Sequence, residues 1–181
     1  NILTSDINYE FQDSENFFGM SASMFENTTI VDRSKYEYII PNIVFERNVY
    51  SGEKLGLVDI YSNAFVKNYK VNQYTKMFIN DFNWKSKQFS NASGIQSGFE
   101  GLLKVVNYEA DNADKYKVDG FTSEAAGVVA YNAKLPLVKK NNTKDKINLL
   151  SPKFSLRAAP NQMRNISDDD LRLSYSNLFS L

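Results

Sequence analysis

The chain has 181 residues, with 21 basic and 21 acidic side chains, so its formal net charge is zero. A balanced charge provides no overall field that would attract nucleic acid or an anionic surface, so we predict no nucleic-acid partner. The absence of both Cys and His removes disulfides, thiol chemistry, the usual general base and the commonest metal ligand. We therefore predict that the chain is not an enzyme and has no catalytic residue, cofactor or metal site.

The apolar content consists largely of Phe and Tyr. Hydrophobic residues make up 43% of the chain and aromatic residues 14%, yet the mean hydropathy is −0.42. This combination is typical of sheets with one apolar and one water-facing face, in a membrane barrel or in a soluble β-sandwich. No apolar run approaches the roughly 18 residues of a spanning helix. The chain begins without a signal peptide and ends within a strand-like pattern, so we expect an excerpt of a longer protein.

Period-two alternation of apolar and polar residues predicts strands along the whole chain. The predicted strands cover residues 2–12, 17–26, 35–50, 54–70, 75–89, 95–110, 121–138, 154–158 and 171–176. Pro41 interrupts the third strand, and because proline cannot donate to a ladder it marks an edge, a bulge or a strand end. A helix is the alternative over 121–138, but Gly127, Val128 and Val129 favour a strand.

Polar and glycine-containing segments separate these strands. Tight turns are predicted at 13–16, 51–53, 71–74 and 90–94, and polar loops at 27–34, 111–119 and 139–146. The sequence therefore predicts an all-β, antiparallel up-and-down meander of about nine strands, without an internal domain boundary over residues 1–181. The first seven segments reach the roughly 9–11 residues of a tilted membrane strand. Barrels alternate short and long connections, and the short turns at 71–74 and 90–93 depart from that rule.

The last segment, residues 149–181, has two alternating stretches around a polar loop. Phe154, Leu156 and Ala158 alternate with Ser155 and Arg157. Further on, three apolar residues alternate with three polar ones, the apolar set being Leu171, Leu173 and Tyr175 and the polar set Arg172, Ser174 and Ser176. The pattern L-x-P-K-x-S-L-R-x-x-P-x-Q-M-R-N-x-S-D-D, followed by R-L-x-x-x-N-L-F-S-L, resembles the barrel domain of the lipopolysaccharide-assembly protein family LptD, also called organic solvent tolerance proteins. The stretch 36–45 resembles it more loosely.

This resemblance implies a large transmembrane β-barrel in the outer membrane of a Gram-negative bacterium. Such proteins carry an amino-terminal periplasmic jellyroll, enclose a plug lipoprotein of the LptE kind and receive lipopolysaccharide from a periplasmic bridge protein. They deliver lipopolysaccharide to the outer leaflet through an opening between the first and last strands, without catalytic residues or cofactors. The chain would then be a run of interior barrel strands in contact with membrane lipid.

The alternation near the C-terminus also suggests candidate functional residues. Ser155, Arg157, Arg172 and Ser174 occupy the polar positions, so we predict that they face a wet lumen. Hydroxyl and charged groups lining a wide barrel suit a phosphorylated glycolipid headgroup. Two other classes stay open, namely another outer-membrane barrel, such as a porin or receptor, and a soluble β-sandwich or fibre module that binds a partner.

Several other patterns have an ordinary interpretation that we prefer. Ser51–Lys54 matches the Ser-Lys nucleophile pattern S-x-x-K, but a hairpin turn explains it. The acidic run 168–170 lacks the ligand spacing of a cation site and is read as a solvated turn. The lysines of the 139–146 loop are Lys139, Lys140, Lys144 and Lys146. They are read as keeping the loop soluble rather than as contacts to lipid phosphates.

Two further patterns concern asparagine and tyrosine. Asn-x-Ser/Thr sites begin at residues 27, 91, 141 and 165, and in so Asn-rich a chain chance explains them. Clustered tyrosines are the signature of an interfacial aromatic girdle, the alternative being a soluble core. The tyrosines in question are Tyr36, Tyr38, Tyr69 and Tyr74. With the family resemblance, the girdle is the preferred interpretation.

Overall fold

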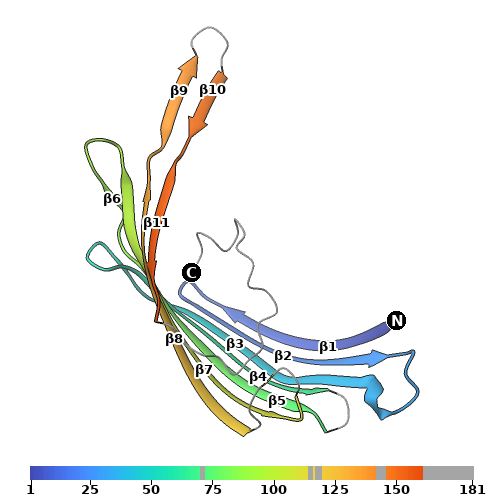
Figure 1. Cartoon of the computed structure of the whole chain (residues 1–181). Helices are drawn as coiled ribbons and strands as arrows, with labels where there is room; N and C mark the ends of the chain where they lie inside the picture. Colours follow the sequence, from blue (N-terminus) through green and yellow to red (C-terminus); the bar gives the residue numbers. More distant parts are fainter. Residues whose placement is uncertain (70–71, 114–115, 117–119, 142–145, 161–181) are drawn as a thin grey trace.

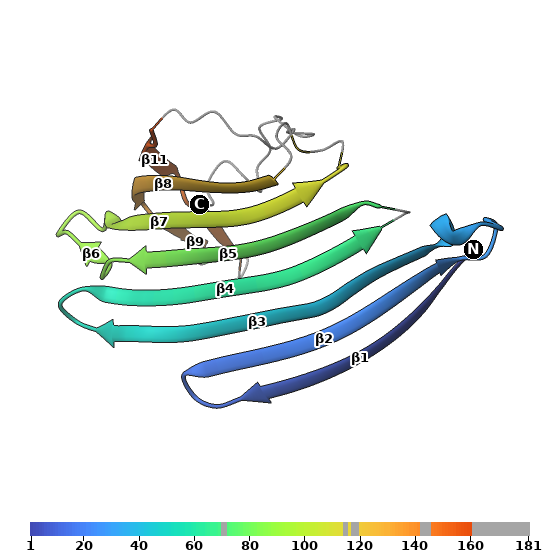
Figure 2. The same ribbon diagram turned by 90° about the horizontal axis from the view of Figure 1, so that it is seen from below.

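The described strands form an antiparallel meander, as the sequence predicts. The computed structural model describes residues 1–69, 72–113, 116, 120–141 and 146–160. Its main sheet has nine strands in the order β1-β2-β3-β4-β5-β7-β8-β11, with the short β6 paired to β7 (Figures 1 and 2). Figure 1 shows these strands as one curved layer, with the hairpin β9–β10 extending beyond it. The described part of the chain contains no α-helix.

The strand bounds follow the alternating segments of the sequence. They are β1 Ile2–Gln12, β2 Asn16–Asn27, β3 Tyr36–Gly52, β4 Gly56–Tyr69, β5 Tyr74–Lys85, β6 Phe89–Ser90, β7 Gln96–Asp111, β8 Gly120–Lys134, β9 Leu137–Asn141, β10 Lys146–Leu150 and β11 Lys153–Ala158, with the 3-10 helix η1 at Arg33–Lys35. The strand alternative for 121–138 is therefore correct, although β8 ends at Lys134 and β9 begins at Leu137. The strand predicted over 171–176 lies outside the described residues.

Several predicted boundaries were wrong. Ser51 and Gly52 belong to β3, and the turn that follows lies at 53–55. The residue directly after this turn, Gly56, has a positive φ of 85°. A Cβ at this position would lie 2.1 Å from the Lys85 carbonyl oxygen. β5 ends at Lys85 rather than at Phe89, because Phe89 and Ser90 fold back to pair with β7.

Proline shapes the sheet at two places. At Pro41 the register of β3 shifts between Ile39 and Asn42, so the proline forms a bulge inside an interior strand. Pro136 and Pro152 divide the last hairpin. The β8–β11 and β9–β10 ladders share one register, and the Leu135 amide donates to the Pro152 carbonyl at 3.1 Å. Because proline has no N–H, the ladder breaks there into two parts.

This hairpin corrects the loop predicted over 139–146. Residues 139–141 lie in β9 and Lys146 begins β10, so both ends of the predicted loop are strand. Residues 142–145 lie outside the described part of the chain. The sheet has two ends, which we name by residues in their connections. The Asp13 end holds the turns at 13–15 and 53–55, and the Lys35 end holds the connection 28–35 and the turn after Tyr69.

The described sheet is not closed. β1 and β11 form its edges, and within the described residues each has a neighbour on one side only. Few side chains are buried, because a single layer has no second layer to cover it. The fully buried residues lie mainly near the Lys35 end, where the Tyr108 ring packs against Tyr116 with centroids 5.0 Å apart.

Candidate functional site

The two faces of the sheet differ in composition. Strand register and the alternation of side chains place each residue on one face or the other. We call the face that carries Phe78 the apolar face. Its large apolar residues are Leu3, Ile7, Tyr9, Phe11, Phe18, Met20, Met24, Tyr36, Tyr38, Ile43, Phe45, Val58, Ile60, Phe78, Phe82, Trp84, Phe99, Leu103, Val105, Phe121, Val129, Tyr131, Phe154 and Leu156.

The opposite face, which carries Asp81, we call the polar face. Its polar residues include Asp6, Asn8, Glu10, Ser21, Ser23, Glu37, Asn42, Glu46, Asp59, Asn63, Lys67, Thr75, Asp81, Asn83, Lys85, Gln96, Glu100, Lys104, Glu124, Asn132, Lys134, Lys153, Ser155 and Arg157. Half-buried apolar side chains such as Ile79 and Leu102 lie among them.

Exposure is inverted relative to a water-soluble domain. Ile7 is 72% exposed and Phe121 75%, both on the apolar face, whereas Thr75 on the polar face is 3% exposed. In the described part of the eight long strands, the exposed large apolar side chains outside the irregularities at Ile40 and Val49 all belong to the apolar face, apart from Ile2. A continuous apolar patch of this extent marks an interaction surface for lipid or protein.

Several polar side chains on the apolar face form hydrogen-bonded pairs. The Ser62 hydroxyl donates to the Asn80 side-chain carbonyl at 2.8 Å, and Ser123 donates to Asn107 at the same distance. Towards the Lys35 end, Glu109 accepts from both Tyr74 and Lys76 at 3.0 Å. Pairing lowers the cost of placing polar groups away from water.

The polar face carries its own cross-strand network. The Asn63 side chain donates to the Asn42 side-chain oxygen Oδ1 at 2.9 Å, and the Asn42 side-chain amide donates to the Ser21 hydroxyl at 3.2 Å. Further along, Lys104 lies 2.9 Å from the Asp81 carboxylate, whose side chain is only 17% exposed. These contacts join β2 to β4 and β5 to β7, and they hold the polar side chains in fixed positions.

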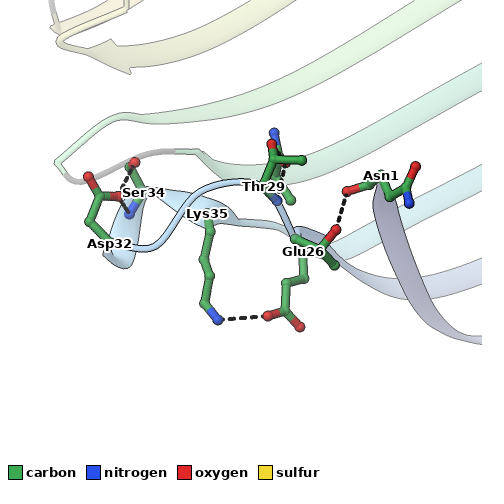
Figure 3. A network of polar contacts seen from close by, with 8 residues as sticks. Asn1, Glu26, Thr29, Asp32, Ser34 and Lys35 are labelled. Atoms are coloured by element: carbon green, nitrogen blue, oxygen red, sulfur yellow. Dashed lines mark hydrogen bonds and ion pairs between the residues drawn. The ribbon is translucent and has the colours of Figure 1, made fainter.

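The connection at the Lys35 end is ordered by short-range polar contacts (Figure 3). Lys35 makes an ion pair of 2.7 Å with Glu26, and Thr28 donates through its amide and its hydroxyl to the Asn1 carbonyl at 3.0 Å. Asp32 accepts from the Ser34 hydroxyl and amide, and these bonds lower the pKa of its carboxyl. The contacts fix the point where β3 enters the sheet.

The turn at the other end is held by Asp13. Its carboxylate accepts from the Glu15 amide at 2.8 Å and from the Asn16 amide at 2.8 Å. These bonds to the charged form lower the pKa of Asp13, with the Glu15 amide as the largest cause.

Two hollows of opposite charge lie on the polar face at the Asp13 end. One, of about 280 Å³, is lined by the lysines Lys85, Lys134 and Lys153 together with Glu100. The other, of about 530 Å³, is lined by acidic side chains with the single basic residue Arg47. Its acidic residues are Asp13, Glu15, Glu46, Asp59 and Asp81. The hollows therefore present different electrostatic environments to a ligand.

The sequence-predicted lumen residues fall partly within the described chain. Ser155 and Arg157 lie on the polar face of β11, opposite Asn132 and Ala130 of β8, and the Ser155 hydroxyl donates to Asn132 at 2.7 Å. Arg172 and Ser174 lie outside the described residues, as does the acidic run 168–170. Whether Ser155 and Arg157 face a lumen stays a prediction.

Three of the four tyrosines of the predicted aromatic girdle lie on the same face. Tyr36, Tyr38 and Tyr74 lie on the apolar face towards the Lys35 end, and the first two rings stack at 6.2 Å. Tyr69 pairs in register with Glu37 of the polar face. The Ser51–Lys54 pattern spans the end of β3 and its turn.

Sequence reasoning missed the two hollows and the Asp81–Lys104 pair. Alternation assigns all these residues to one face, but it gives no register between strands that lie far apart in the chain. The described residues contain no cluster of three or more acidic side chains placed to hold a metal ion. In the same part of the chain, no helix has the length and hydropathy to cross a membrane.

Comparison with known proteins gives no relative. No family model, curated protein or solved structure matches this chain.

Proposed function

We propose that this chain is part of the wall of an outer-membrane β-barrel that conducts lipopolysaccharide to the outer leaflet. The inverted distribution of side chains carries the proposal, since exposed apolar residues cover one face and the more buried, polar residues cover the other. In this arrangement the apolar face meets lipid and the polar face meets a wet interior.

An apolar face that stayed exposed to water would carry a large energetic cost, and this favours a face that is covered. Burying one large apolar side chain contributes about 1.5–3 kcal/mol. Ile7, Phe121 and Leu156 are each more than 60% exposed. They lie on the apolar face of β1, β8 and β11, at or next to the two edges of the sheet. Lipid covers such a face without a specific partner.

The polar pairs of the apolar face suit the same environment. Ser62–Asn80 and Asn107–Ser123 satisfy each other across neighbouring strands. Buried polar groups cost little in an apolar medium only when they are paired. Two charged residues of this face, Lys76 and Glu109, form an ion pair of 3.0 Å near the start of β5.

The finer assignment rests on the resemblance of residues 149–181 to the LptD family. A polar face rich in hydroxyl, amide and charged groups is suited to a phosphorylated glycolipid headgroup. The proposed partners are lipopolysaccharide, membrane lipid, a plug lipoprotein of the LptE kind and a periplasmic bridge protein, with the bacterial outer membrane as the location and no chemical reaction.

Two other functions would use the same sheet but place different surroundings against its apolar face. A porin or receptor barrel would place lipid on the apolar face without binding lipopolysaccharide. A soluble sandwich would cover that face with a second sheet. The cover on the apolar face is therefore the quantity to measure first.

Trp84, the single tryptophan, is a natural probe of this cover. It lies on the apolar face, and its indole N–H donates to the Leu55 carbonyl at 2.7 Å. In full-length protein reconstituted into vesicles, brominated lipid tails should quench Trp84 fluorescence. The matched control is Trp84→Phe with Tyr61→Trp, which moves the probe to the polar face and should abolish this quenching.

Three results distinguish the functions. Quenching of Trp84, with lipopolysaccharide and a small lipoprotein in the detergent extract, is the result expected. Quenching without either companion favours a porin or receptor. Extraction of the protein in plain buffer, with no quenching, overturns the membrane assignment.

A further inference from the structure

The charges of the polar face are segregated across the sheet. On β1 and β3 the charged residues of this face are all acidic, namely Asp6, Glu10, Glu37 and Glu46. On β8 and β11 they are Glu124, Lys134, Lys153 and Arg157, which are mostly basic. The net charge of zero therefore hides an acidic side and a basic side.

The basic hollow lies at the Asp13 end of the basic side. Three different strands supply its lysines, with Lys85 from β5, Lys134 from β8 and Lys153 from β11. Gln96 pairs with Lys134 from the other side, and Asn132 also lines the hollow. Lysine and amide side chains thus line one space of about 280 Å³, together with Phe99, Glu100 and Phe154.

The register within this hollow is unfavourable for the protein alone. Lys134 and Lys153 are direct cross-strand partners, which places their Cβ atoms roughly 4.5–5.5 Å apart. Like charges directly opposite each other in a sheet are destabilising. Glu100, which lies opposite Lys85, also lines the hollow. A bound anion lowers the repulsion between neighbouring lysines.

We propose that the hollow formed by Lys85, Lys134 and Lys153 binds a phosphate monoester group. Three ammonium groups with amide donors suit a doubly charged group of several acceptor oxygens. The volume lies at the lower end of ligand pockets, which suits a phosphorylated sugar unit rather than a whole lipid. The phosphate site is inferred from these residues alone. That the phosphate group belongs to a glycolipid headgroup rests on the proposed function.

The acidic hollow serves as an internal control. It occupies the same end and the same face, but Glu46 and Asp59 repel an anion there. Removal of these two carboxylates should leave phosphate binding unchanged or strengthen it.

The test measures glucose 6-phosphate binding to detergent-solubilised full-length protein by phosphorus NMR titration. Replacing all three lysines with Gln should weaken binding by on the order of tenfold or more. Replacing all three with Arg should retain binding, and so should Glu46→Gln with Asp59→Asn. Affinity of the wild type should fall as salt rises, because exposed charges are screened.

A second arm uses purified lipopolysaccharide and separates the two proposals. Lysine-dependent binding of both ligands supports the site and its glycolipid source. Lysine-dependent binding of glucose 6-phosphate alone keeps the site and removes the lipopolysaccharide function. Wild-type affinity that the Gln variant retains, or no binding of the sugar phosphate by the wild type, overturns the site. If the Gln variant fails to fold, the salt dependence of binding is the deciding measurement. The site is then overturned when the affinity of the wild type or of the Arg variant does not change with salt.

Discussion

The Ser62 hydroxyl donates a hydrogen bond of 2.8 Å to the Asn80 side chain in the middle of an otherwise apolar surface. The two residues are direct partners of β4 and β5, flanked by the apolar pairs Ile60–Phe82 and Ala64–Phe78. Such a pair is inexpensive only while both members are present, because a single unpaired polar group in an apolar medium keeps its full desolvation cost.

Asn80→Leu should therefore lower the free energy of unfolding by about 1–2 kcal/mol in detergent or lipid, because Ser62 loses its partner. The double variant with Ser62→Ala should recover most of that loss. Urea unfolding followed by tryptophan fluorescence provides both values. Equal stability of the single and double variants would show that water, not lipid, contacts this pair.

Leu102 and Leu103 provide a test of the two faces at neighbouring positions. Leu103 is 47% exposed on the apolar face, and the half-buried Leu102 lies on the polar face. Leu103→Arg should lower the free energy of unfolding by about 2–4 kcal/mol, because lipid cannot solvate the charge. Leu102→Arg should cost less. The opposite order, measured by the same unfolding experiment, is the result expected of a soluble protein and contradicts the proposal.

Gly56 is required by both its backbone and its neighbours. Its φ is 85°, and a Cβ would lie 2.1 Å from the Lys85 carbonyl oxygen, whereas Gly120 has φ of 103° with open space around it. Gly120→Ala should cost about 1–2 kcal/mol from backbone strain alone. Gly56→Ala should cost more, since the end of β5 must also move. Comparable thermal midpoints for the two variants would rule out the close approach.

Asp13 should make the first turn dependent on acid pH. Because its hydrogen bonds lower the pKa of the folded carboxyl, its stabilisation is present above the unfolded pKa of about 3.9 and is lost as pH falls through the folded value. Asp13→Ala should therefore be less stable than wild type at pH 7, and the difference should shrink as the pH falls below about 3.9. Unfolding curves across this range measure the difference, and a constant gap would exclude the carboxylate as its cause.

Local pattern predicted most of the fold. The alternation around Ile7, Phe78 and Phe154 was enough to predict strands and to assign their two faces, because side chains alternate in any extended chain. It failed where backbone pairing decided the outcome. Gly52 and Gly56 are four residues apart, and the positive φ of Gly56 together with the approach of Lys85 selects the second.

The sequence alone determined the antiparallel meander, the apolar and polar positions of each strand and the absence of Cys and His chemistry. The tertiary structure decided which positions of different strands come together. It placed Lys134 opposite Lys153, Lys104 beside Asp81 and Ser62 beside Asn80. Register depends on pairing between residues separated in the chain and on bulges such as that at Pro41, and neither is encoded in the period of a single strand.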